Sequence, residues 1–155
     1  MIDNFITPQT RFLSNFYPHK NNGELYPHKV VVSYNGLDFD CVENAYQAAK
    51  AANEVDMRQF VFNTPFWAKK FVDDGGLKIR SDWHDVRMAV MINLVQQKFR
   101  RNLELAKMLL ATGEQELVEG NTWGDTYWGV CEGRGENNLG RILMMTRRLL
   151  RGTIR

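Results

Sequence analysis

The sequence predicts an α+β fold, a mostly helical single domain over residues 1–155 with a small antiparallel sheet. Several segments repeat apolar residues at helical spacing, and residue types that start or stop helices bound them. One Asn-Gly pair lies between two short runs of β-forming residues, which is a strong short-range signal for a hairpin. A chain of 155 residues is long enough to bury a real core, and no repeat or low-complexity linker divides it.

Composition and charge are those of an ordinary soluble protein. Apolar residues make up 44% of the chain, charged residues 25%, and the formal net charge is +2. This charge is too small to indicate a nucleic-acid or membrane partner by itself. The basic excess lies near the C-terminus, and we interpret it as the solvated end of a helix rather than a binding patch. Its residues are Arg147, Arg148, Arg151 and Arg155.

The cysteines and the N-terminus favour a cytoplasmic protein. Cys41 and Cys131 do not make a disulfide scaffold, and the chain shows no signal-peptide pattern. No apolar run approaches the roughly 18 residues that a membrane span needs, so no membrane partner is expected. The histidines and cysteines lack known metal-ligand spacing, and we expect neither metal nor cofactor. Cys131 is interpreted as a small buried residue, with a nucleophile as the less favoured alternative.

The N-terminal segment predicts a fixed, partly buried turn. Ser14 and Asn15 lie between large apolar neighbours, and both side chain types readily bond nearby backbone. An N-terminal arm packed on the core is an equally good interpretation.

A hairpin follows the N-terminal segment. Val30–Tyr34 and Leu37–Asp40 are the expected strands, and the Asn-Gly pair between them suits a type I′ turn. The sheet would extend to Glu116–Glu119 if a third strand joins it.

Residues 41–52 predict a helix with two different stripes. One stripe of small side chains favours close packing against a neighbour; it contains Val42, Ala45, Ala49 and Ala52. The adjacent stripe carries Glu43, Gln47 and Lys50. Positions seven apart differ by about 20° around a helix and by roughly 10 Å along it, so Glu43 and Lys50 face the same way without a forced contact. Such a face could hold a sugar, and a solvated helix face is the alternative.

Two helices are predicted in the middle of the chain. Thr64-Pro65 is a good cap and first-turn pair for a helix that ends near Gly75-Gly76. Asp82 could cap the longest helix, whose expected apolar side is Trp83, Val86, Val90, Leu94, Val95 and Phe99. Trp67 and Trp83 are interpreted as core residues, although either could wall a pocket.

Two more helices complete the predicted fold. Asn102 restarts a helix that Gly113 closes, and Asn137 or Asn138 caps the last one. The side chains of the last helix expected to face inward are those of Leu139, Ile142, Leu143, Thr146 and Leu149.

The stretch from Trp123 to Gly140 is the strongest candidate for a site. It combines two tryptophans, a tyrosine, an aspartate and several glycines just before the last helix. Aromatic rings, flexible backbone and a helix N-terminus suit a phosphorylated, ring-bearing small molecule. The glycine spacing fits neither a dinucleotide fingerprint nor a P-loop. A phosphate site with Arg134 as a partner and a purely structural turn both stay open.

Three stretches together resemble one known family. They are Phe12-Leu13-Ser14-Asn15-Phe16, Val42-Glu43-Asn44-Ala45-Tyr46-Gln47-Ala48-Ala49-Lys50, and Trp123 to Gly140. In this order and spacing they are similar to the YbiA-like or NADAR family, whose members also carry a tryptophan where Trp83 stands. The resemblance implies a YbiA-like fold and hydrolysis of an N-glycosidic C1′–N bond.

The resemblance also implies roles for individual residues. Glu43 matches the motif glutamate and is expected to do acid/base or electrostatic work on the charge that develops on the ribose. Lys50 matches the motif lysine and could form a Schiff base with the opened sugar, provided that burial lowers its pKa. Asp125 matches an acidic position that could orient a ribose hydroxyl or water. The expected substrate-binding residues are Ser14, Asn15, Phe16, Gln47, Trp83, Tyr127, Trp128, Gly133, Arg134 and Asn137. The ring of Trp128, with that of Trp83 or Tyr127, would stack on the base. Gly133, Arg134 and Asn137 would hold phosphate.

The resemblance leaves three functions open. The first is an N-glycosidase that cleaves the aminopyrimidine from ribose 5-phosphate in riboflavin-pathway intermediates. The alternative is a hydrolase that removes ADP-ribose from guanine in DNA or nucleotides, which the C-terminal arginines would suit. The third is a non-catalytic module that binds ADP-ribose or NAD-like ligands. The partner is accordingly a phosphorylated riboside or an ADP-ribosylated guanine, and the oligomeric state is unknown.

Overall fold

The computed structural model describes residues 1–153, which form two compact units. One unit is residues 15–102, and the other joins residues 1–14 to the chain from Leu103 onward. Helices dominate both, and the single antiparallel pair of strands among the described residues lies in the first unit. The predicted fold class is confirmed, whereas a single domain over residues 1–155 stays a prediction. In the described part of the chain, every helix is too short or too polar to cross a membrane.

The hairpin of the 15–102 unit forms where the Asn-Gly pair predicts it. Strand β1 (Val32–Tyr34) pairs antiparallel with β2 (Leu37–Phe39). Asn35 and Gly36 have φ values of 50° and 78°, and a type I′ turn requires positive φ at both positions. The strands are shorter than expected because Val30 and Val31 lie outside the ladder.

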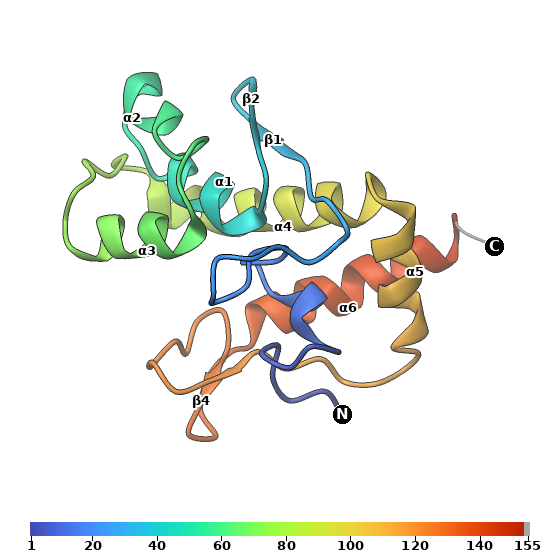
Figure 1. The fold of residues 1–155 in the computed structure, drawn as a ribbon. Helices are drawn as coiled ribbons and strands as arrows, with labels where there is room; N and C mark the ends of the chain where they lie inside the picture. Colours follow the sequence, from blue (N-terminus) through green and yellow to red (C-terminus); the bar gives the residue numbers. More distant parts are fainter. Residues whose placement is uncertain (154–155) are drawn as a thin grey trace. The chain divides into compact units, whose positions relative to one another are not determined.

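Four helices complete this unit, and α1 lies at its centre. Helix α1 (Val42–Ala49) packs against α3 (Pro65–Asp73) and α4 (Trp83–Arg100), as Figure 1 shows. Every residue of α1 is buried, including its polar ones. The short helix α2 (Glu54–Arg58) was not predicted, because five residues are too few to show a period.

The predicted end of the first helix is wrong by three residues. Helix α1 stops at Ala49, because the following residues pair with a distant segment instead of continuing the helix. Arg80 N–H donates to Lys50 O at 2.8 Å, and Ala52 N–H donates to Lys78 O at 3.1 Å. Ala52 is therefore exposed, not part of the packed stripe.

Helices α3 and α4 begin at the predicted residues, but only one has the predicted cap. Thr64 Oγ1 accepts a hydrogen bond from Trp67 N–H, which confirms the first cap. Asp82 makes no capping bond, because both of its carboxylate oxygens accept from the Arg80 guanidinium. Val86 and Val90 are only half-buried. The core side of α4 includes Met91 and Lys98, which the apolar pattern missed.

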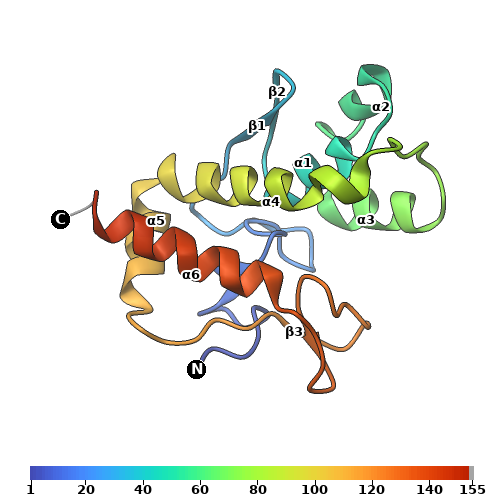
Figure 2. The same ribbon diagram turned by 180° about the vertical axis from the view of Figure 1, so that it is seen from behind.

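The other unit contains a 3-10 helix (Arg11–Leu13), α5 (Leu103–Ala111) and α6 (Asn138–Arg151). Helix α5 packs against α6 (Figure 2). Gly113 has a φ of 64° after the end of α5, which suits a helix stop. Leu149 was expected inside and is 45% exposed, because the apolar side of α6 runs to Leu150 instead.

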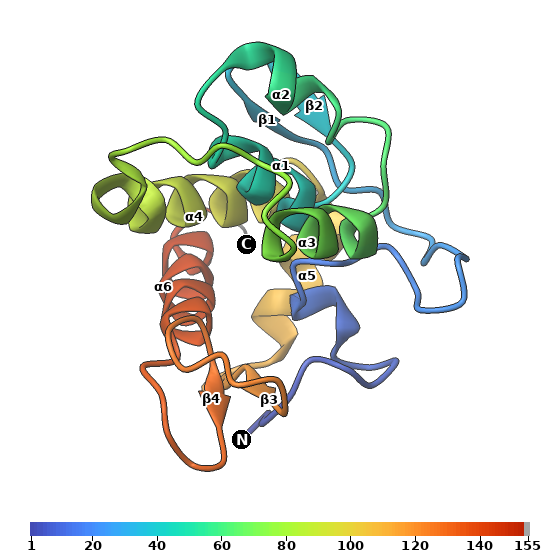
Figure 3. The ribbon, with the colours of Figure 1, turned by 90° about the vertical axis from the view of Figure 1, so that its left-hand side faces the viewer.

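Two short parallel strands precede α6. They are β3 (Gly120–Asn121) and β4 (Val130–Cys131), which lie side by side in Figure 3. The suggestion that Glu116–Glu119 joins the hairpin sheet is wrong. Glu116 O instead accepts from Ile2 N–H, and Val118 N–H donates to Ile2 O, both at 2.8 Å. The N-terminal residues thus take the backbone groups that a third strand would have used.

Candidate active site

Helix α1 presents Glu43 and Gln47 one turn apart in a buried setting. Glu43 is 8% exposed and Gln47 is 3% exposed. Gln47 Nε2 donates a hydrogen bond of 2.7 Å to Glu43 Oε1. The start of the helix is held by Asn15, whose carbonyl accepts from Glu43 N–H at 3.0 Å. Glu43 and Gln47 therefore lie on one face of the helix as predicted, and this part of the stripe is buried rather than exposed to solvent.

Burial shifts the pKa of Glu43. Loss of solvent raises the pKa of this carboxyl group above its ordinary value, and Asp73 adds to the rise. The Gln47 hydrogen bond and the charges of Lys50 and Lys69 oppose the rise without cancelling it. The protonated acid is therefore favoured relative to an exposed glutamate, and proton donation requires this form.

Lys50 occupies the C-terminal cap position of α1. Its Nζ lies 5.1 Å from the centre of the Tyr46 ring and 5.9 Å from that of Trp83. The two rings contact each other edge to face at 5.1 Å. Burial lowers the pKa of the Lys50 ammonium, helped by Lys69 and Arg87 and opposed by Glu43 and Asp73. Its neutral amine, the nucleophilic form, is therefore favoured relative to an exposed lysine.

Helix α3 contributes two charged groups that the sequence reasoning missed. Lys69 Nζ lies 3.1 Å from Asp73 Oδ2, and both charges act on Glu43 and Lys50. Their i, i+4 spacing was visible in the sequence, but exposed helix faces carry such pairs as well. Tyr46 was also missed as a contact of Lys50, although it stands four residues before it.

Asn15 and Phe16 are fixed by contacts inside the same unit. Asn15 Nδ2 lies 3.5 Å from Met91 Sδ, and the Phe16 ring meets the Phe66 ring edge to face at 5.1 Å. Ser14 is half-buried and ends the 3-10 helix. Substrate contacts by these three residues stay predictions.

In the other unit, Asp125 shapes the loop that carries the aromatic residues. Its Oδ1 accepts from Tyr127 N–H at 3.1 Å and from Trp128 N–H at 2.9 Å. Asn121 braces the same loop, because its side chain accepts from Asp125 N–H and donates to Asp125 O. The rings of Tyr127 and Trp128 meet edge to face at 4.7 Å. Asp125 thus has a visible structural role, and its catalytic role stays a prediction.

The backbone N–H groups at the start of α6 already have hydrogen-bond partners within the protein. The N–H groups of residues 136–139 donate to carbonyl oxygens of residues 126–129. Asn137 has a φ of 55°, and its side chain accepts from Glu119 N–H at 3.0 Å and donates to Leu117 O at 2.9 Å. A phosphate would find none of these donors free. These hydrogen bonds support the alternative interpretation of this stretch, in which it is a purely structural turn.

Gly133 and Arg134 belong to a tight turn. Cys131 and Arg134 exchange two backbone hydrogen bonds, and the residues between them, Glu132 and Gly133, have φ values of 52° and 75°. These positive values suit a type I′ turn and explain the glycine. Gly133 and Arg134 are both exposed, and phosphate binding by them stays a prediction.

One possible metal-binding cluster lies just before α1. Ligand atoms of His19, Asp40 and Cys41 lie within 4.8 Å of one another, and His19 Nε2 is 3.1 Å from Asp40 Oδ1. The distance in sequence between His19 and the other two hid this cluster. Burial raises the pKa of the Cys41 thiol, which disfavours the thiolate that a metal would bind. The expectation of no metal stays a prediction.

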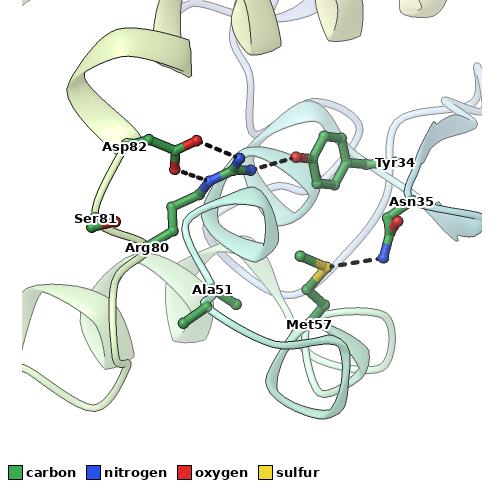
Figure 4. A pocket seen from close by; sticks show the side chains of 8 residues that line it. Tyr34, Asn35, Ala51, Met57, Arg80, Ser81 and Asp82 are labelled. Atoms are coloured by element: carbon green, nitrogen blue, oxygen red, sulfur yellow. Dashed lines mark hydrogen bonds and ion pairs between the residues drawn. The ribbon is translucent and has the colours of Figure 1, made fainter.

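An open groove of about 650 Å³ lies elsewhere in the 15–102 unit (Figure 4). In it the Arg80 guanidinium binds Asp82 and donates to the Tyr34 hydroxyl at 2.9 Å. None of the predicted site residues lines it; its lining is Tyr34, Asn35, Ala51, Ala52, Met57, Arg80, Ser81 and Asp82. The groove is therefore distinct from the Glu43 and Lys50 side chains.

A buried acid and a partly buried amine with oppositely shifted pKa values are typical of a catalytic site. Comparison with known proteins identifies the family to which this chain belongs. Residues 4–151 match the NADAR domain family. The chain belongs to the NADAR family.

Relatives agree with this assignment over most of the chain. Identity is 32% over 139 residues to the N-glycosidase YbiA of Escherichia coli, covering 88% of this chain and 84% of that protein. The NMR structure of E. coli YbiA matches with a TM-score of 0.75 at 30% identity, covering 97% of this chain and 87% of that one. Identity is 40% over 139 residues to a riboflavin biosynthesis protein of Vibrio vulnificus, covering 85% of this chain. This chain spans only 37% of that longer protein.

Proposed function

We propose that this NADAR-family enzyme hydrolyses the C1′–N bond between a phosphorylated ribose and a base, with aminopyrimidine ribosyl phosphates of the riboflavin pathway as substrates. The observation that carries the proposal is the pairing on α1 of a buried carboxyl group, whose pKa is raised, with an amine whose pKa is lowered. The substrate class is supported by similarity to proteins named as N-glycosidases and as a riboflavin biosynthesis protein.

Cleavage begins with Glu43 in its acid form. The C1′–N bond breaks, its electron pair goes to the leaving nitrogen, and Glu43 supplies the proton that this nitrogen takes up. The carboxylate that remains stabilises the positive charge on the ribose ring. Burial makes both steps effective, because it favours the acid beforehand and strengthens the attraction between opposite charges afterwards.

Lys50 then acts as the nucleophile. Its neutral Nζ forms a bond with C1′, the C1′–O4′ bond breaks, a proton passes from Nζ to O4′, and a protonated Schiff base remains. Water adds to this carbon, the bond between carbon and Nζ breaks, and ribose 5-phosphate leaves with the amine restored. The proton that water gives up returns to the Glu43 carboxylate, which regenerates the acid. The Tyr46 and Trp83 rings beside Nζ stabilise its cationic states through their π faces.

Mass spectrometry of the products tests the reaction and the substrate together. The protein is incubated separately with a riboflavin-pathway ribosylaminopyrimidine phosphate and with a DNA oligonucleotide carrying ADP-ribosylated guanine. Free ribose 5-phosphate from the first alone supports the proposal. Free ADP-ribose from the second alone would replace it with the guanine hydrolase. Binding of ADP-ribose without turnover of either substrate would indicate a ligand-binding module.

Two variants test the catalytic roles. Glu43→Gln should abolish release of the base, and sodium borohydride should trap a sugar adduct on wild-type protein but not on Lys50→Met. Equal turnover by wild type and Glu43→Gln would contradict the assigned acid.

The C-terminal arginines give little support to a nucleic-acid substrate. Arg147 is buried and donates to Thr112 Oγ1 at 2.8 Å. Arg151 pairs with Glu114 at 2.7 Å and also binds the Gly113 carbonyl. Arg155 lies outside the described residues. Two of the four arginines are therefore engaged within the protein, and we keep the guanine hydrolase as an outcome of the test.

A further inference from the structure

Gln47 carries a buried acceptor that the protein itself does not satisfy. Its Nε2 donates to Glu43, but its Oε1 is buried without a hydrogen-bond partner, although the residue is only 3% exposed. A buried unsatisfied acceptor costs free energy, and its causes in native structures include a role in catalysis or an ordered water or ion as its partner. In this hydrogen bond the NH₂ group of Gln47 is the donor and Glu43 Oε1 is the acceptor, which leaves the amide oxygen as the group without a partner. Oε1 therefore faces away from the carboxylate.

A second unsatisfied acceptor in α1 has a different setting. Asn44 Oδ1 is also buried without a partner, but Asn44 is 0% exposed and its Nδ2 is anchored to the carbonyls of Phe60 and Asn63. A ligand cannot reach Asn44 without disrupting that loop. The side chain of Gln47 instead bonds the carboxyl group of Glu43, which is proposed to react. Of the two acceptors, only the one on Gln47 belongs to an amide that is bonded to the proposed catalytic acid.

We infer that Gln47 Oε1 accepts a hydrogen bond from the ribose 2′-hydroxyl and makes the enzyme selective for ribosides over 2′-deoxyribosides. This inference rests on the proposed hydrolysis at C1′. The carbon next to C1′ carries the 2′-hydroxyl, and Gln47 is the direct hydrogen-bonding neighbour of Glu43, which acts at C1′. The two ends of one amide thus contact the acid and the adjacent sugar hydroxyl.

The hydroxyl contact matters most while the bond is breaking. Positive charge on the ribose ring makes the 2′-hydroxyl a better donor, so the contact strengthens in the transition state; hydrogen bonds to this hydroxyl are known to assist glycoside cleavage in that way. A substrate without the hydroxyl would leave the buried Oε1 without a hydrogen-bond partner. Sites built to bind a hydroxyl reject analogues that lack it for this reason.

The test compares a riboside phosphate and its 2′-deoxy analogue, with the same base, on several variants. The kcat/KM ratio of riboside to deoxyriboside is measured for each protein. A 2′-deoxyriboside is intrinsically more labile, but this effect is the same for every variant and cancels when the ratios are compared. Gln47→Met removes the acceptor at similar volume, and Gln47→Asn withdraws it by one methylene. Gln47→Glu is the matched control, since it retains an acceptor.

We expect the ratio to fall at least about tenfold in Gln47→Met and Gln47→Asn, the loss of about one hydrogen bond. It should stay within about threefold of wild type in Gln47→Glu. An unchanged ratio in either of the first two variants would overturn the inference while leaving the hydrolysis intact. Failure of wild type to cleave the riboside would overturn the proposed function and this inference with it. Thermal unfolding identifies any variant that has not folded, and the remaining acceptor-deleted variant then decides the result.

Discussion

Replacing Asn137 by alanine separates its structural role from the phosphate-binding role that the sequence suggested. Asn137 is 9% exposed and makes two side-chain hydrogen bonds to the backbone at Leu117 and Glu119. Their loss costs about 1 kcal/mol each. Alanine in a left-handed conformation adds roughly 1 to 2 kcal/mol. The free energy of unfolding should therefore fall by about 3 to 4 kcal/mol, which corresponds to a Tm about 10 °C lower for a chain of this length.

Urea unfolding of wild type, Asn137→Ala and Asn137→Gly measures these contributions. The glycine variant loses the same hydrogen bonds but tolerates the positive φ, so it should be less destabilised than the alanine variant. A loss below about 1 kcal/mol in Asn137→Ala would refute the reasoning, because two buried hydrogen bonds and the backbone strain cannot cost so little together. A stable Asn137→Ala protein with weakened binding of a ribosyl phosphate would favour the phosphate role instead.

Three further predictions concern the proposed reaction. Glu43→Gln should lower kcat at least about 100-fold and yet stabilise the fold above acidic pH. Because the pKa of Glu43 is raised in the folded protein, the stability that this group contributes is fully present below the ordinary carboxyl pKa and is lost as the pH rises through the raised value. Urea unfolding at about pH 4 and about pH 8 should therefore show that the variant is more stable than wild type only at the higher pH. Lys50→Met should also stabilise the protein near neutral pH. Because the pKa of Lys50 is lowered in the folded protein, the free energy of unfolding of wild type falls as the pH drops from the ordinary lysine pKa through the lowered one. Equal pH dependence of unfolding in wild type and variant would contradict this. Asp125→Asn keeps an Oδ1 acceptor and should unfold like wild type, whereas Asp125→Ala should lose about 1 to 2 kcal/mol; an inactive but fully stable Asp125→Asn would indicate that the charge itself is required.

Local signals in the sequence predicted local structure well. The turn at Asn35-Gly36 and the cap at Thr64 involve neighbours within a few residues, and both are confirmed. The predictions for Ala52 and for Glu116–Glu119 were wrong because distant partners decide those segments. Ala52 pairs with Lys78, and Glu116 pairs with Ile2, and neither partner leaves a trace in the local pattern.

The chemistry of the site was predicted only in part. The spacing of Glu43, Gln47 and Lys50 put them on one stripe, and the resemblance marked the first and last as reactive. The sequence could not reveal that this stripe is buried, because charged residues four and seven apart are typical of a solvated helix face. The burial of α1 depends on elements that pack around it, α3 and α4 among them, and burial is the largest cause of the opposite pKa shifts of Glu43 and Lys50.

The backbone bonds between the aromatic loop and α6 also bear on how that part of the chain moves. Residues 126–129 cannot swing away from the helix without breaking the bonds that satisfy the N–H groups of residues 136–139. Loop opening and fraying of the first helical turn are therefore one cooperative event rather than two independent ones. The amide protons of residues 136–139 should therefore share one protection against hydrogen exchange, and that protection would report how readily the loop carrying Tyr127 and Trp128 leaves its place.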